Sequence, residues 1–93
     1  MLAKVKKSSG SLHIHRQKIL VADDDPAILD ALKMMLEFCD YDVQTIADGA
    51  VLPKVKKSKP QLLLLDIWMS GFDGRDICKK LKAKNETKNI PII

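Results

Sequence analysis

This 93-residue sequence is poor in cysteine and in aromatic side chains, and these shortages narrow its class. Its two cysteines, Cys39 and Cys78, lack metal-ligand spacing and are too few for a disulfide framework. We expect each to be a reduced thiol buried in a helix, as in the cytosol. With one Trp, one Tyr and two Phe, any core has to be aliphatic. No apolar run has the length of a membrane span, so we expect a cytoplasmic domain without membrane contact.

The net charge of +4 is unevenly distributed. Residues 1–18 hold five of the 16 basic side chains and no acid, which leaves 11 basic against 12 acidic residues in the remainder. We predict a flexible basic tail over residues 1–17 and one domain over residues 18–93. The tail has no aromatic residue among its lysines, so a solvated extension is favoured over a nucleic-acid-binding arm. His13 and His15 could face one metal ion, but they lack a third ligand.

Four short runs of residues predict strands, and the continuous apolar run Ile19–Ala22 is typical of a strand buried on both faces. They alternate with helical patterns through connections of a few residues, which implies a parallel sheet with right-handed crossovers. We therefore expect an α/β fold of order β-α-β-α-β-α-β. The four runs are Ile19–Ala22, Asp42–Ile46, Leu62–Leu65 and Ile90–Ile93.

Three helices are predicted between these runs. The first begins at Pro26 with Asp25 as its N-cap and ends near Phe38. Its expected apolar face consists of Ile28, Leu29, Leu32, Met35 and Leu36.

The second helix follows Asp48-Gly49, with Asp48 as a cap, and runs through Lys57. Pro53 requires that this helix begin shortly before it. The third helix is capped by Asp73 and ends near Lys84, with Ile77, Cys78 and Leu81 facing inward. The lysines of the second helix are read as a solvated face rather than a basic patch; they are Lys54, Lys56, Lys57 and Lys59.

Carboxylates end two of the predicted strands. Asp23 and Asp24 follow the first strand, and Asp66 follows the third. If these strands are neighbours, about 5 Å apart, the three side chains can surround one hard cation such as Mg²⁺. One carboxylate could then accept a phosphoryl group and become an aspartyl phosphate. Each Asp alone could equally be a helix cap, but the matched strand contexts together favour a site.

The same residues carry a family resemblance. Residues 18–26 (KILVADDDP) and 63–74 (LLLDIWMSGFDG) resemble the opening strand and the phosphoacceptor strand and loop of response regulator receiver domains. Asp48-Gly49 is similar to the family's usual start of the second helix, and Ile90–Ile93 to its fourth strand. The resemblance covers residues 18–93 and implies an incomplete flavodoxin-like fold with about four parallel strands and three helices.

The resemblance also implies the chemistry. Asp66 would be the phosphoacceptor in a two-component phosphorelay, and Asp23 and Asp24 would hold Mg²⁺ with the backbone carbonyl of Trp68 as a further ligand. The Trp68 side chain would lie at the mouth of the site. The phosphodonor would be a histidine kinase, a phosphotransfer protein or a small acyl phosphate. Such a domain is not an enzyme beyond weak self-phosphorylation and self-dephosphorylation, and we expect no direct contact of this segment with nucleic acid.

The sequence departs from the family pattern in several places. Ser70 stands where proline is usual, and Pro53 replaces an apolar helix residue. The sequence stops at Ile93, before the family's hydroxyl residue and lysine that read the phosphate, and neither Thr87 nor Lys88 can be carried onto those positions. We expect the apolar face of the first helix to be partly bare and the sheet edge unpaired.

Two rival functions stay open from the sequence. One is a non-switching interaction fragment that dimerises through the bare face, with vestigial acids. The other is a phosphohydrolase with Asp66 as nucleophile. Related enzymes carry an Asp two residues after the nucleophile, where this chain has Trp68, so the sequence speaks against that rival.

Overall fold

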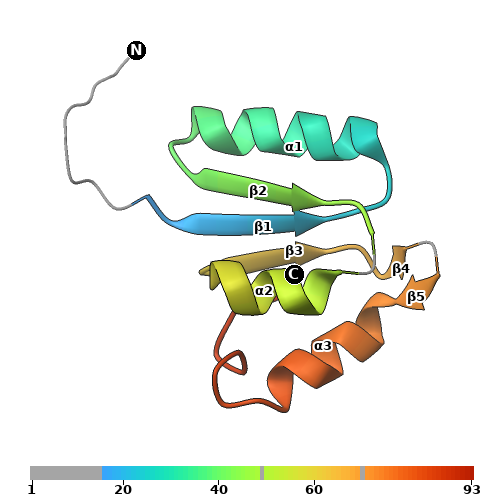
Figure 1. Cartoon of the computed structure of the whole chain (residues 1–93). Coiled ribbons are helices and arrows are strands. Elements are labelled where there is room, and N and C mark those ends of the chain that lie inside the picture. Colours follow the sequence, from blue (N-terminus) through green and yellow to red (C-terminus); the bar gives the residue numbers. More distant parts are fainter. Residues whose placement is uncertain (1–15, 49, 70) are drawn as a thin grey trace.

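The computed structural model describes residues 16–48, 50–69 and 71–93 (Figure 1). The expectations for the tail, for His13 and His15, and for Ser70 concern positions outside these ranges, except for the tail's last two residues. Among the described helices, none is both long and apolar enough to cross a membrane.

The sheet has three parallel strands, β1 (Lys18–Ala22), β2 (Asp42–Ile46) and β3 (Leu62–Leu65). Their order is β2-β1-β3, so β1 is central and β3 is its neighbour. Ala22 pairs with Ile46 on one side and with Leu65 on the other, and the three strands therefore end at the same level. This register confirms that the carboxyl ends of the first and third predicted strands meet at one edge.

The predicted fourth strand does not form a regular strand of the sheet. Residues 90–93 run beside β3, where Ile92 forms an isolated parallel bridge with Leu63. The Leu63 N–H donates to the Pro91 carbonyl at 3.0 Å, and the Ile93 N–H donates to the Leu63 carbonyl at 2.9 Å. The far edge of β3 is thus covered by a short extended segment rather than by a full strand.

Local side-chain chemistry begins two of the helices where expected. Asp25 caps α1 (Pro26–Phe38) by accepting from the Ala27 N–H at 2.9 Å. Asp73 caps α3 (Gly74–Lys82) by accepting from the Arg75 N–H.

The second helix begins differently. In α2 (Val51–Ser58), Pro53 is the third residue, where it removes no internal hydrogen bond. The expectation that Asp48 caps this helix is wrong. The cap position is Ala50, and Asp48 instead accepts from the Ala50 N–H inside the preceding turn.

Between β3 and α3, the segment expected to be a plain loop forms a small antiparallel hairpin. Its strands are β4 (Trp68–Met69) and β5 (Phe72–Asp73), with Trp68 opposite Asp73. Gly71 in the connection has φ +87°, a conformation that side-chain-bearing residues rarely adopt.

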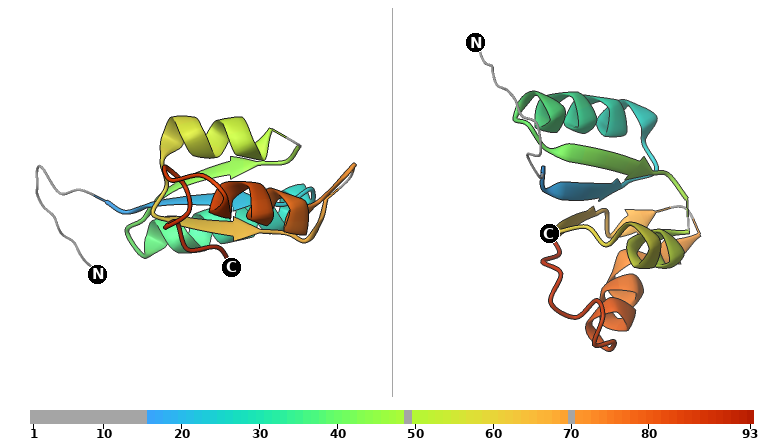
Figure 2. Two further views of the ribbon diagram at one scale, coloured as in Figure 1. Left: turned by 90° about the horizontal axis from the view of Figure 1, so that it is seen from below. Right: turned by 60° about the vertical axis from the view of Figure 1, so that its left-hand side comes forward.

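Two aliphatic clusters hold the helices to opposite faces of the sheet (Figure 2). Leu29 of α1 packs on one face, with half-buried Leu32 and Leu36 beside it. The helices α2 and α3 share the cluster on the other face, which includes Leu20, Val51, Val55, Leu63, Ile77 and Leu81.

Other predicted core positions lie outside these clusters. Cys39 is exposed, contrary to expectation, because it stands at the C-cap of α1, beyond the residues that face the sheet. Cys78 is half-buried. As expected, the predicted apolar face of α1 is partly bare, at Ile28 and Met35, and Met34 and Phe38 are exposed as well.

Candidate functional site

The backbone carries the acidic residues just past the strand ends. The Asp23 N–H donates to the Ile46 carbonyl at 3.1 Å, and the Asp66 N–H donates to the Ala22 carbonyl at 2.9 Å. The interstrand hydrogen bonding therefore continues one residue beyond β1 and β3. This extension fixes the positions of both Asp backbones relative to each other.

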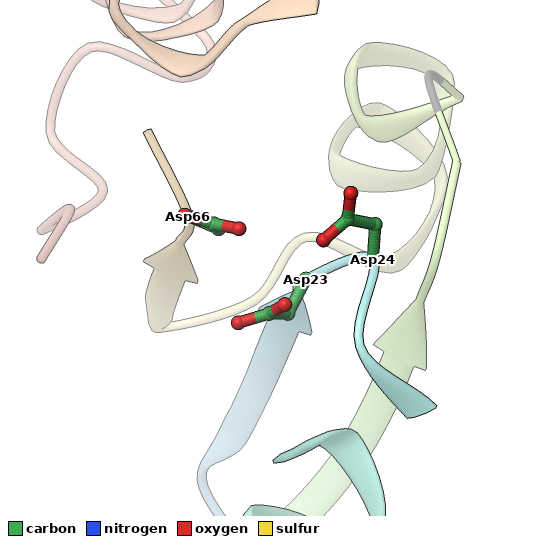
Figure 3. A group of neighbouring side chains, drawn as sticks. All are labelled: Asp23, Asp24 and Asp66. Atoms are coloured by element: carbon green, nitrogen blue, oxygen red, sulfur yellow. The ribbon is translucent and has the colours of Figure 1, made fainter. Parts of the chain in front are cut away.

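The three predicted carboxylates come together at this edge (Figure 3). One oxygen from each of Asp23, Asp24 and Asp66 lies within 4.8 Å of the other two. Asp23 and Asp66 are half-buried and Asp24 is exposed, so the group is open to solvent on one side. In Figure 3, the carboxylates of Asp24 and Asp66 point toward each other.

Short-range hydrogen bonds orient two of these carboxylates. Asp23 Oδ1 accepts from the Asp25 N–H at 2.9 Å, and Asp66 Oδ1 accepts from the Trp68 N–H at 3.2 Å. Each bond uses one of the several lone pairs of a carboxylate. Turn geometry thus sets the side-chain direction while both groups keep acceptor capacity for a ligand.

This donor set fits a hard divalent cation. The ligand atoms are carboxylate oxygens, which Mg²⁺ and Ca²⁺ prefer, and opposite oxygens around such an ion stand about 4–5 Å apart. Three close carboxylates also repel one another, and a cation relieves that repulsion. Within residues 16–48, 50–69 and 71–93, Asp23, Asp24 and Asp66 are therefore a group that could hold a metal.

Gly74 positions the site in a way that the sequence interpretation missed. A Cβ on Gly74 would stand 2.5 Å from the Asp66 carbonyl oxygen and 2.9 Å from Ile67 Cα. The Gly74 N–H also donates to the Ile67 carbonyl at 2.7 Å. The start of α3 is thus packed directly on the backbone that carries Asp66. The sequence holds one signal of this, since a helix already capped by Asp73 has no need of glycine at its first position.

The Trp68 and Arg75 side chains, which follow Asp66 in the chain, stack on each other. The Trp68 side chain is 68% exposed, and the Arg75 Cζ atom lies 5.0 Å from the centroid of its ring. Arg75 also pairs with the Asp73 carboxylate at 2.8 Å. Hydrogen bonds from Arg75 hold the pKa of Asp73 below its ordinary value. The backbone N–H of Trp68 bonds to Asp66, and the expected place of the Trp68 side chain at the mouth of the site stays a prediction.

Comparison with known proteins identifies the family. Residues 19–93 match the response regulator receiver domain, and the chain belongs to this family of signalling domains. It is 38% identical over 79 residues to the DNA-binding response regulator MtrA of Mycolicibacterium smegmatis, covering 84% of this chain and 33% of that protein. It is also 42% identical over 69 residues to the alkaline phosphatase synthesis transcriptional regulatory protein PhoP of Bacillus subtilis, covering 73% of this chain and 29% of that protein.

Solved structures agree with this assignment. The N-terminal domain of a response regulator receiver protein from Methanoculleus marisnigri superposes with a TM-score of 0.76 at 37% identity, over 81% of this chain and 62% of that one. The chemotaxis response regulator CheY4 of Vibrio cholerae gives 0.79 at 28% identity, over 84% and 66%. The flavodoxin-like receiver fold is therefore confirmed. The chain spans about a third of the length of the curated relatives that it matches first.

Proposed function

We propose that this chain is a phosphoacceptor in two-component signalling and that it takes a phosphoryl group on Asp66. The observation that carries the proposal is the convergence of Asp23, Asp24 and Asp66 within 4.8 Å at the carboxyl edge of the sheet. In open α/β sheets, this edge is where ligands bind. The family membership supports the same reading, because receiver domains are signalling domains.

In the proposed reaction, an Asp66 carboxylate oxygen attacks the phosphorus of the donor in line with the leaving group. A new P–O bond forms while the P–N bond of a phosphohistidine, or the P–O bond of an acyl phosphate, breaks. The electron pair stays with the imidazole nitrogen, which takes up a proton, or with the departing carboxylate. The donor would be a histidine kinase, a phosphotransfer protein or a small acyl phosphate.

The metal in this proposal is Mg²⁺, held by Asp23, Asp24, Asp66 and the backbone carbonyl of Trp68. When bound, it would offset the negative charge that gathers on the transferring group. The protein's own part is to orient Asp66 through the Trp68 N–H and to keep the three carboxylates together.

The setting of this reaction is proposed to be the cytoplasm. Both cysteines are free thiols, and the exposed Cys39 suits a reducing compartment. The rival interaction fragment is not favoured, because vestigial acids have no reason to retain this arrangement around one point.

Intact mass spectrometry after incubation with acetyl phosphate and Mg²⁺ tests the proposal. We expect an adduct of one phosphoryl group on the wild-type chain and none on Asp66→Asn. Asp76→Asn, which removes an exposed carboxylate from α3, is the matched control and retains the adduct. An adduct that survives Asp66→Asn would refute the assignment, and so would the absence of any adduct from a chain shown by circular dichroism to be folded.

A further inference from the structure

The charges of this chain separate along its length. Residues 16–50 contain three basic and eight acidic side chains, a net charge of −5. Residues 51–93 contain ten basic and four acidic side chains, a net charge of +6. A nearly neutral domain is thus strongly bipolar, and its positive half holds α2 and α3.

The fold places much of this positive charge on two neighbouring helices that cover the same face of the sheet. Because α2 and α3 pack on the same apolar cluster and contact each other, their outward sides lie away from α1 (Figure 2). Six lysines of α2, α3 and the residues just beyond them are exposed and belong to what we call the lysine face: Lys56, Lys57, Lys59, Lys79, Lys80 and Lys84.

Two other cations of this half, Lys82 and Arg75, are already engaged. The Lys82 ammonium donates to the carbonyls of Lys88 and Ile90, and Arg75 pairs with Asp73. The ion pairs found in residues 16–48, 50–69 and 71–93 use Arg16, Lys33 and Arg75, and none of them takes up a member of the lysine face. Acids near this face include Glu86, whose charge acts on Lys84, and Asp73, whose charge interacts with that of Lys79.

Two members of the face are close enough to oppose each other. The neighbouring Lys56 side chain holds the pKa of Lys84 below its ordinary value, although Glu86 acts in the opposite direction. The helices α2 and α3 therefore bring like charges together where the sequence alone suggested a merely solvated helix. An anion bound between them would relieve this repulsion.

The composition of the face selects the kind of anion. The large exposed apolar side chains of the described ranges lie on α1, at Ile67 and Trp68, and at Ile93, and none belongs to α2 or α3. The centre of a protein–protein interface is depleted in lysine and rich in aromatic residues, and an interfacial membrane helix needs apolar side chains to insert. Contacts to nucleic-acid phosphates need neither aromatic nor inserting apolar side chains. Duplex DNA also needs no aromatic side chains on which unpaired bases would stack.

We propose that the lysine face of α2 and α3 binds the phosphate backbone of duplex DNA without reading its sequence. The proposal departs from the sequence-based expectation of no direct contact between this segment and nucleic acid. The surface is built from residues other than the three site carboxylates, so the proposal stands apart from phosphorylation of Asp66.

Fluorescence anisotropy with a labelled, random-sequence DNA duplex tests the proposal on the full chain. The variant Lys57→Gln, Lys79→Gln, Lys80→Gln removes three charges from the face. The matched control Lys4→Gln, Lys6→Gln, Lys7→Gln removes three charges from the N-terminal segment. We expect the face variant to bind on the order of tenfold more weakly. The slope of log K against log salt should become shallower by about three. The control should keep most of the affinity and slope.

Several outcomes would overturn the proposal. Equal losses in the two variants would assign binding to net charge, and a larger loss in the control would assign it to the N-terminal segment. Wild-type protein that binds anionic phosphatidylserine vesicles but not the duplex would point to membranes instead. Head-to-tail self-association without DNA, measured by sedimentation at low salt and lost in the face variant, would assign the lysine face to the acidic half of a second copy instead of to DNA. Thermal melts check that the exposed substitutions leave the fold intact.

Discussion

The Cα atom of Gly74 lies so close to the Asp66 backbone that a methyl group there would stand 2.5 Å from the Asp66 carbonyl oxygen. This distance is shorter than real side-chain carbons tolerate, and the atoms in the way are backbone rather than the end of a flexible side chain. The first turn of α3 and the site residue are therefore held at a spacing that only glycine permits.

Replacing Gly74 with alanine should weaken both the fold and the site. Glycine-to-alanine changes in helices usually stabilise by about 0.5–1 kcal/mol, but here the overpacking should reverse the sign and cost about 1–3 kcal/mol. Urea unfolding measures the loss, and phosphoryl incorporation should fall because Asp66 has to move. Lys79→Ala, on the exposed side of the same helix, is the control and should change stability by less than about 0.5 kcal/mol. A Gly74→Ala chain as stable as wild type would contradict the packing argument.

Trp68 offers a direct signal for metal binding. It is the chain's single tryptophan, and its backbone N–H donates to Asp66 Oδ1. Titration with Mg²⁺ should change its fluorescence and raise the melting temperature, since a ligand at a hundred times its Kd stabilises by about 2.7 kcal/mol. The double variant Asp23→Asn, Asp24→Asn should lose both responses, whereas Asp48→Asn should keep them. A fluorescence change that persists in the double variant would place the metal elsewhere.

The acidic site could be predicted because strand ends are readable from the sequence. Asp23 and Asp66 each follow a buried apolar run, and parallel strands end at a common edge. The sequence left one condition open, which was whether the two strands are neighbours. The order β2-β1-β3 supplies it. The close approach of Gly74 depends on tertiary packing and leaves almost no trace in the sequence.

The missed features share a physical cause. The strands of the β4–β5 hairpin have two residues each, too short for any periodicity to show. Cys39 was expected to be buried because an apolar pattern does not say where the sheet-facing side of a helix stops. The lysines at the end of α2 are exposed, as a solvated face requires, but the sequence does not show that α3 brings Lys84 beside Lys56.

The pairing of Asp73 with Arg75 predicts a pH dependence of stability. Hydrogen bonds from Arg75 lower the pKa of Asp73 from 3.8 in the folded chain. The charged carboxylate therefore stabilises the fold fully above pH 3.8, and this contribution is lost as the pH falls through the lower folded value. Asp73→Asn can still cap α3 but cannot carry the charge. Its melting temperature should lie below that of wild type at neutral pH and converge with it at acid pH. A difference that stays constant across the acid range would contradict the pairing.

The Thr87 hydroxyl can be tested for a role in packing as opposed to a role in the reaction with phosphate. Its side chain is 2% exposed, and Oγ1 donates to the Leu81 carbonyl at 2.5 Å, so it ties the residues after α3 to the end of that helix. Thr87→Val keeps the shape and removes the donor, which should cost about 1–3 kcal/mol in urea unfolding, whereas Thr87→Ser keeps the hydroxyl and should lose less.

Neither Thr87 variant should alter phosphoryl incorporation at Asp66 under conditions in which the chain is folded, because this hydroxyl is committed to the Leu81 carbonyl rather than directed at the acidic edge. The intact-mass assay with acetyl phosphate gives the measurement, with the folded fraction of each variant checked by circular dichroism. If folded Thr87→Val lost the phosphoryl adduct while Thr87→Ser kept it, the hydroxyl would have a part in the reaction, and its assignment to packing alone would be wrong.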